Sequence, residues 1–189
     1  MKEDRKMAEK RVWASIQKIA GDAGRKCGWE YLGNPCTAKR INNLMIGFQE
    51  NPFQPGFYGI RIPIGEMDGL QVNVLIENQK ELIIGIQTEQ ILDGDANSLA
   101  FDAYRAMLGK LAESQSGWNL DSPGWLAWKT PEVRLNFSSV SNRAFQDIVL
   151  NRDNSEALYL IMEEISDILQ EISEIVINRE IEVYGTVVN

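Results

Sequence analysis

Residues 57–88, FYGIRIPIGEMDGLQVNVLIENQKELIIGIQT, decide the fold class of this chain. They hold three apolar segments, 57–64, 70–77 and 81–88, which two short turns separate. The middle segment alternates apolar with more polar residues, the period of two expected when one face of a strand is covered and the other is wetter. Turns this short cannot hold a parallel crossover, so the sequence predicts antiparallel strands.

A further strand is predicted at 41–49, before a turn rich in proline and glycine, which gives a meander of four antiparallel strands over 41–88. The pattern predicts one α+β domain over 1–189, with an antiparallel sheet of four to six strands covered by N-terminal, middle and C-terminal helices. The other expected segments are a basic amphipathic helix at 1–24, a helix at 97–114, a tryptophan-rich loop and strand at 116–138, with the strand at about 133–138, and helices at 141–178.

The first and last helices carry apolar stripes. In the first, Gly21 or Gly24 is expected to end the helix, and the core positions are Ala8, Val12, Trp13, Ile16, Ile19 and Ala20. In the last, the stripe is wider than a two-stranded coiled-coil seam, so the helix lies on the sheet or is shared between the core and a dimer partner through 156–178. Its opposite face carries acidic residues, namely Glu163, Glu164, Asp167, Glu171 and Glu174.

Composition places the chain among globular proteins, with 44% hydrophobic and 24% charged residues. No apolar run is long enough for a membrane helix, and the charged start MKEDRKMAEK does not resemble a signal peptide, so we expect a cytoplasmic protein without membrane contact. The net charge of -8 is uneven, because residues 1–40 carry +5 and residues 41–189 carry -13. This favours a basic first helix packed beside the acidic last helix; the alternative is a basic arm for nucleic acid or an acidic partner.

The chain has no histidine. Catalytic triads with an imidazole base, histidine-based zinc sites and histidine-metal oxygenase sites are therefore excluded. Carboxylate, lysine, tyrosine and cysteine chemistry remain, and carboxylates that bind magnesium are the most accessible of these.

Three of the five tryptophans, Trp118, Trp125 and Trp128, fall within one irregular stretch. Clustered tryptophans stack on a nucleic-acid base or a peptide side chain, and Lys129 and Arg134 are close enough in sequence to meet a phosphate. These five residues are the candidate binding site. The alternative is that the rings cap an open end of the core beneath a long loop.

The block at 72–76, followed by a charged turn and by 83–87, resembles the strand pair of PD-(D/E)XK nucleases. The resemblance implies a metal-binding aspartate on the first strand and an acid-x-lysine triplet on the second. Asn73, Gly85 and Gln87 stand at those three positions, so all three chemical groups are missing. A second register uses Asp68, Glu77 and Lys80, in which the acid and the lysine are three residues apart across a turn.

The order of elements over 40–178 is also similar to the accessory region that follows the nuclease core in some bacterial PD-(D/E)XK proteins. The similarity lies in the strand motifs at 57–60 and 83–86, a helix, the tryptophan segment, a short strand and a final acidic helix. It implies a non-catalytic module associated with defence or mobile elements.

Three functional hypotheses follow. The first is a non-catalytic binding or accessory domain that recognises a protein or nucleic acid and needs no cofactor. The second is a magnesium-dependent nuclease that uses Asp68, Glu77 and Lys80. The third is an acidic inhibitor that competes with nucleic acid for the basic cleft of a partner enzyme.

Overall fold

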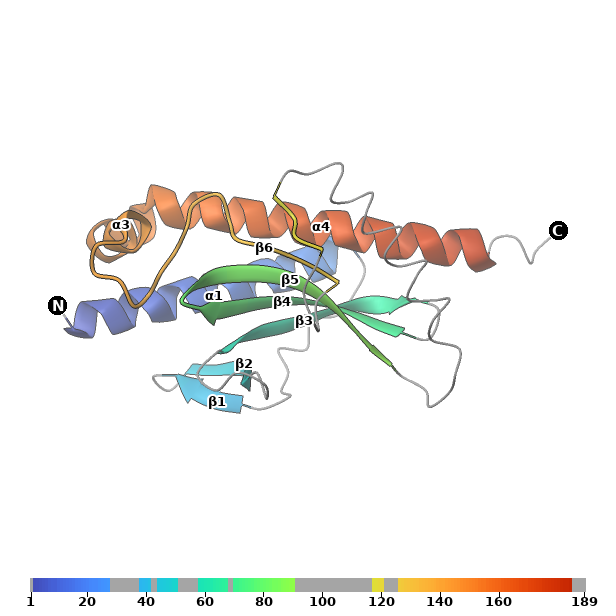
Figure 1. The fold of residues 1–189 in the computed structure, drawn as a ribbon, viewed down its shortest axis with the longest axis horizontal. Helices are drawn as coiled ribbons and strands as arrows, with labels where there is room; N and C mark the ends of the chain where they lie inside the picture. Colours follow the sequence, from blue (N-terminus) through green and yellow to red (C-terminus); the bar gives the residue numbers. More distant parts are fainter. Residues whose placement is uncertain are drawn as a thin grey trace.

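A computed structural model describes residues 2–27, 38–41, 44–50, 58–67, 70–90, 117–120 and 126–184 (Figure 1). Its strands form one antiparallel sheet in the order β1-β2-β3-β4-β5-β6. The elements are α1 (Lys2–Cys27), β1 (Ala38–Ile41), β2 (Leu44–Glu50), β3 (Tyr58–Met67), β4 (Leu70–Gln79), β5 (Glu81–Gln90), β6 (Ala127–Lys129), α3 (Arg143–Asn151), the 3-10 helix η1 (Arg152–Asn154) and α4 (Glu156–Tyr184).

The predicted α+β class is confirmed, because helices pack on an antiparallel sheet. The four-strand meander is present as β2 to β5, and β1 and β6 extend it at the two edges. Strands β3, β4 and β5 match the three segments expected between residues 57 and 88 to within three residues at each end. A register shift between Pro63 and Gly65 marks a bulge in β3.

The strand expected at 41–49 is present as β2, but it begins three residues later, at Leu44. The chain forms a hairpin there, in which Ile41 at the end of β1 pairs with Leu44 at the start of β2. Residues 42 and 43 are both asparagine, a residue that tolerates the left-handed backbone of a two-residue hairpin turn. The Asn-Asn pair was the sequence signal for this reversal.

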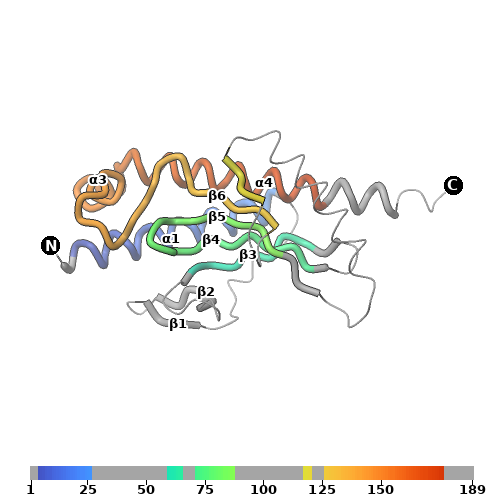
Figure 2. The backbone as a smooth tube through the Cα atoms, viewed as in Figure 1, coloured from blue at the N-terminus to red at the C-terminus, as the bar shows by residue number. Residues whose placement is uncertain are grey.

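The helices α1 and α4 pack against each other and against the same face of the sheet (Figures 1 and 2). We call this the helix face; from the central strands it contributes Ile60, Ile62, Val72, Val74, Ile76, Leu82, Ile84 and Ile86. All these side chains are at most 3% exposed, and Trp13 of α1 is 0% exposed in the same core. Burial of this apolar surface is the main force that holds the two layers together.

Helix α1 continues past both glycines at which it was expected to end. Gly24 and the neighbouring Ala23 are buried, and Lys26 donates a hydrogen bond from Nζ to Gln170 Oε1 of α4 at 2.7 Å. These tertiary contacts outweigh the helix penalty of a glycine, which is about 1 kcal/mol relative to alanine.

The apolar stripe of α4 is buried within the chain. Ile161, Ile165, Ile168, Leu169 and Ile172 are all at most 2% exposed. The sheet and the other helices therefore cover the surface for which a dimer partner was the alternative. None of the described helices is long and apolar enough to cross a membrane.

The short strand of the tryptophan segment lies earlier than expected. We expected it at about 133–138, whereas β6 occupies Ala127–Lys129, and Leu135 contacts β5 through one hydrogen bond from the Leu82 N–H, at 2.8 Å. The helix expected at 97–114 lies outside the described residues.

Candidate functional site

The sheet face opposite the helices, which we call the far face, is not the wet surface that the alternation predicted. On β4, Asn73 is 1% exposed, and Leu75 and Glu77 are each 3% exposed. The far face of β4 is therefore buried and does not form an open platform.

Glu77 is a buried carboxylate on this far face. It accepts a hydrogen bond from Gln79 Nε2 at Oε2, 2.6 Å away. Burial raises the pKa of the Glu77 carboxyl above its ordinary value, while the hydrogen bond from Gln79 and the charge of Arg61 act in the opposite direction. A neutral carboxyl is thus favoured more than on the protein surface.

Gly59 of β3 lies directly opposite Glu77. A Cβ atom at this position would lie 2.1 Å from the Ile76 carbonyl oxygen and 2.8 Å from the Glu77 Cα atom. The absence of a side chain at Gly59 therefore lets β3 approach β4 closely at the place where the carboxylate is buried.

Two of the three residues of the nuclease hypothesis, Glu77 and Lys80, lie in the described part of the chain. Lys80 is exposed at the tip of the β4–β5 hairpin with a φ of 84°, a left-handed conformation that is uncommon outside glycine. Asp68 lies outside the described residues. Within the described part of the chain, no group of three or more carboxylate or cysteine residues could hold a metal ion.

The tryptophan segment forms the edge of the sheet. Trp128 lies opposite Gly85 of β5. On its other side, the backbone of Trp128 exchanges two hydrogen bonds with the backbone of Asn119, at 2.7 and 2.9 Å. Trp118 packs against the core, and the Lys129 ammonium lies 5.9 Å from the centre of its ring. Both residues are partly exposed, but their indole N–H groups are buried and have no hydrogen-bond partner among the described residues. Trp125 lies outside the described residues.

The two cations of the candidate binding site each have a carboxylate partner. Lys129 is 7% exposed, and its Nζ lies 2.6 Å from Glu164 Oε1 of α4. The other oxygen of Glu164 accepts a hydrogen bond from the Glu132 backbone N–H at 2.9 Å. Arg134 is more exposed, and its Nη1 lies 3.3 Å from Glu81 Oε2. Their charges are therefore partly or largely neutralised within the chain.

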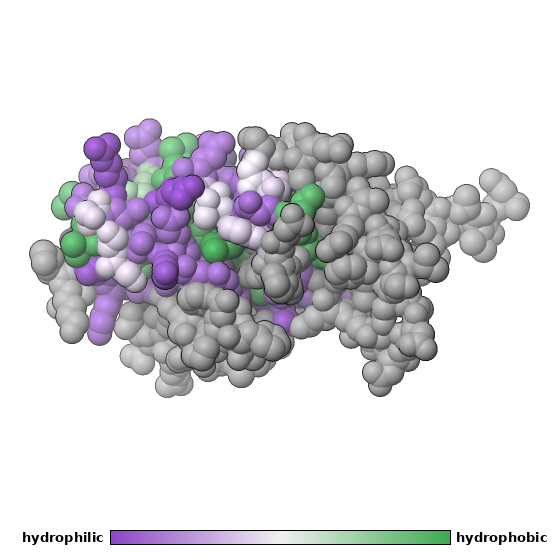
Figure 3. Space-filling view, viewed as in Figure 1, coloured by the Kyte–Doolittle hydropathy of each residue, from purple (hydrophilic) through white to green (hydrophobic). Residues whose placement is uncertain are grey.

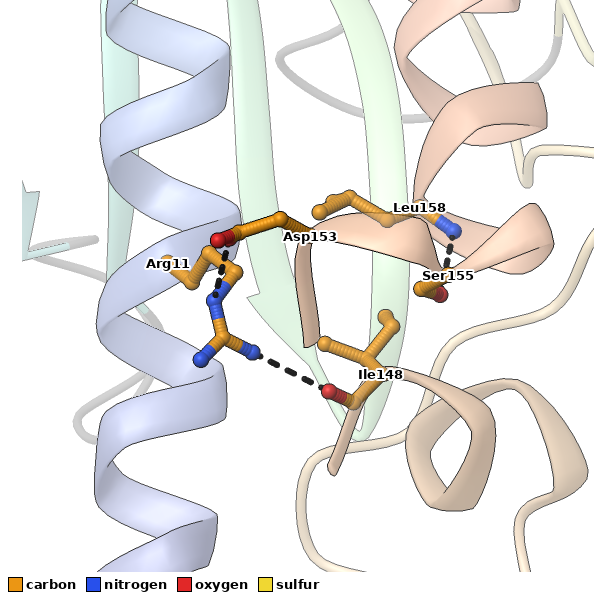
Figure 4. Close-up of polar contacts among 5 residues, drawn as sticks. All are labelled: Arg11, Ile148, Asp153, Ser155 and Leu158. Atoms are coloured by element: carbon orange, nitrogen blue, oxygen red, sulfur yellow. Dashed lines mark hydrogen bonds and ion pairs between the residues drawn. The ribbon is translucent and has the colours of Figure 1, made fainter. Parts of the chain in front are cut away.

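A corner between α3 and α4 ties three helices together (Figure 4). Arg11 of α1 donates from Nη1 to the Ile148 carbonyl oxygen at 3.1 Å, and its Nε lies 3.3 Å from Asp153 Oδ1. Ser155 caps α4, because its Oγ accepts the Leu158 backbone N–H at 3.0 Å. The basic residue Arg11 thus serves the packing of the chain.

Several large apolar side chains remain exposed and were not singled out from the sequence. They are Met7, Leu120, Val140, Leu150, Tyr159 and Leu160, with exposed fractions of 39% to 76%. Tyr159 and Leu160 lie outside the apolar stripe of α4, and this position was the signal that could have identified them. Leu120 lies beside Asn119 at the edge of the sheet, next to the tryptophans.

The exposed and partly exposed residues at the sheet edge, Trp118, Leu120 and Trp128, form the candidate interaction site. No protein-family model matches the chain, and neither a curated protein nor a solved structure matches it significantly.

Proposed function

We propose that this chain is a non-catalytic binding module that recognises a protein partner through the edge of its sheet. The contact surface comprises Trp118, Asn119, Leu120 and Trp128, which we call the tryptophan edge. The observation that carries the proposal is the combination of two partly exposed tryptophan residues with an exposed leucine at one sheet edge. Tryptophan is enriched among the residues that dominate protein interfaces.

A protein partner is favoured over nucleic acid by the charges at this edge. Lys129 is buried in an ion pair with Glu164, and Arg134 forms an ion pair with Glu81, so neither is a strong ligand for a phosphate group. The whole chain carries a net charge of -8, which repels a polyanion. What this edge offers a partner is mainly aromatic and apolar surface.

The experiment compares capture of partners from host extract by the wild-type chain and by Leu120→Ser, followed by measurement of the affinity for the captured protein. Leu120 is 39% exposed, so the substitution leaves the core intact. We expect the affinity to fall about tenfold because an apolar contact is lost. The matched control is Leu150→Ser, at an exposed leucine of α3, which should bind as the wild type does. Equal affinity of the wild type and Leu120→Ser would refute the tryptophan edge as the contact surface.

The resemblance to the accessory region of bacterial PD-(D/E)XK proteins supports a place among defence or mobile-element proteins. The nuclease alternative has a direct assay, namely magnesium-dependent cleavage of mixed DNA and RNA substrates. Activity in the wild type that disappears in Glu77→Gln would replace the binding proposal with the nuclease.

The acidic-inhibitor alternative rests on the outward carboxylates of α4, among them Glu163, Asp167 and Glu174, which are exposed. It predicts capture of a nucleic-acid-binding enzyme that weakens with salt. Substitution of these residues by glutamine or asparagine tests it, because unchanged capture would exclude the acidic face.

A further inference from the structure

The outer face of α4 is acidic along its described length. Between Glu156 and Val176 the helix contains no lysine or arginine. Its exposed carboxylate residues are Glu156, Glu163, Asp167 and Glu174. Two large apolar side chains lie among them, Tyr159 at 63% and Leu160 at 40% exposure. The inward face of the helix is buried, so this outer face is the surface that α4 offers to a partner.

The outer face of α1 is basic on balance, and an exposed acidic residue that it also carries, Asp22, is paired with Arg25 of the same helix. Lys18 is exposed and Lys10 is partly exposed on the side of the helix away from its core residues. Met7, at 53% exposure, lies on the same side. Two other basic residues of this helix, Arg5 and Arg11, make contacts inside the chain and are not part of this surface.

The two helices lie side by side and run in the same direction (Figures 1 and 2). Arg11 is opposite Asp153 near one end, and Lys26 is opposite Gln170 near the other. Lys18 is eight residues before Lys26, and Met162 is eight before Gln170, so the equal rise of the two helices places Lys18 level with the part of α4 that contains Tyr159 and Glu163. An acidic stripe and a basic stripe therefore lie next to each other in one layer.

We propose that this layer binds a second copy of the same chain. A twofold axis parallel to the helices would place α1 of each copy over α4 of the other, so that Lys18 meets Glu163 twice. An interface of this kind is self-complementary, because the same patch supplies both charges. A twofold axis perpendicular to the helices would instead place the acidic α4 over the partner's α4 and the basic α1 over the partner's α1, which is repulsive.

Apolar contact contributes to the same interface. Met7 on α1 and Tyr159 and Leu160 on α4 project from the two stripes and lose their exposed surface when the second copy docks. On the face shown in Figure 3, apolar areas are small and set among hydrophilic residues. In the proposed interface, Met7, Tyr159 and Leu160 likewise stand among charged residues, a mixed surface typical of a reversible dimer whose strength depends on salt.

The experiment measures the association of the full chain by analytical ultracentrifugation over a range of concentration and salt. The variants are Lys18→Glu, Glu163→Lys and the exchange variant that carries both substitutions. Each single variant places two like-charged contacts in the symmetric dimer, so we expect its dissociation constant to rise about tenfold. The exchange variant restores opposite charges at both contacts and should return to near the wild-type value. Both substituted side chains, Lys18 and Glu163, are exposed, so folding is preserved.

Recovery of dimerisation in the exchange variant supports the proposal, since reversing the charge of a second residue would not repair a folding defect. A wild-type chain that stays monomeric at millimolar concentration overturns it. A dimer that is unaffected by either single reversal, or that dissociates only in Leu120→Ser, also overturns it, because the copies then meet elsewhere.

Discussion

Gly59 faces Glu77 across the β3–β4 ladder at a place where no side chain fits. The sequence shows a glycine between an aromatic and an apolar residue, and that pattern alone does not say what lies opposite. The structure supplies the reason, since a Cβ atom would enter the backbone of β4. Because the obstacle is a carbonyl oxygen and a Cα atom of a central strand, it cannot move away as a flexible side chain would.

We therefore predict that Gly59→Ala destabilises the protein by about 3 kcal/mol, the upper part of the range for overpacking a core. Urea unfolding followed by circular dichroism measures the loss. The control is Gly21→Ala in α1, where the nearest heavy atom to the new Cβ is Arg25 Nη1 at 3.7 Å. This control should gain about 0.5–1 kcal/mol because alanine favours a helix more than glycine does. A Gly59→Ala variant as stable as the wild type would contradict the close approach of the two strands.

At the scale of the element, the corner between α3 and α4 depends on Asp147. Its Oδ2 accepts hydrogen bonds from Ser155 Oγ at 2.5 Å and from the Ala157 backbone N–H at 3.0 Å. A residue of α3 thus accepts hydrogen bonds from donors at the start of α4, where backbone N–H groups have no partner within the helix. Arg152, between the two helices, has a φ of 50°, so the corner also includes a backbone conformation that is uncommon for arginine.

The hydrogen bond from Ser155 is the largest of the effects that lower the pKa of the Asp147 carboxyl below its ordinary value, and the Ala157 N–H adds to it. A lowered pKa in the folded state means that the stabilisation is complete above the pKa of the unfolded chain. It is lost as the pH falls through the folded value. Asp147→Asn should cost about 1 kcal/mol at pH 7, as loss of a helix cap does, and less at pH 3.

Thermal unfolding at both pH values measures this difference. The control is Asp167→Asn, an exposed carboxylate of α4, which should leave stability at pH 7 within about 0.5 kcal/mol of the wild type. An Asp147→Asn variant that is equally destabilised at pH 7 and pH 3 would show that the charge of the carboxylate plays no part in the corner.

The elements differ in how far the sequence predicts them. The hairpins of β3, β4 and β5 follow from local patterns, since alternation and short turns are contained in a few residues. The length of α1 does not, because contacts with α4 carry the helix past two glycines. The partners of Lys129 and Glu77 were equally out of reach, since each depends on which strand or helix lies beside it in space.

At the scale of the whole molecule, the uneven charge of the sequence has a structural explanation. The interpretation that the basic first helix packs beside the acidic last helix agrees with the contact between α1 and α4. Three basic residues of α1 anchor it: Arg5 to the Phe137 carbonyl at 2.7 Å, Arg11 to Asp153, and Lys26 to Gln170. Basic side chains of α1 thus help to join the two ends of the chain, through one ion pair and through hydrogen bonds to uncharged oxygens.

The ion pair between Lys129 and Glu164 joins the edge of the sheet to α4, and its removal tests how the two layers are held. The side chains are 8% and 18% exposed, so loss of one partner leaves the other charge in a mostly dry environment. We predict that Lys129→Met destabilises the protein by about 3 kcal/mol. The double variant Lys129→Met with Glu164→Leu should recover most of this loss, because no charge is then buried and the exposed Glu132 N–H is free to bind water.

Urea unfolding of the wild type, the two single variants and the double variant gives the coupling free energy between Lys129 and Glu164. Arg134→Met serves as the control, since its pair with Glu81 is exposed and should contribute less than about 1 kcal/mol. A double variant no more stable than Lys129→Met would mean that the charges themselves, rather than the apolar contact of the two layers, hold α4 to this edge of the sheet.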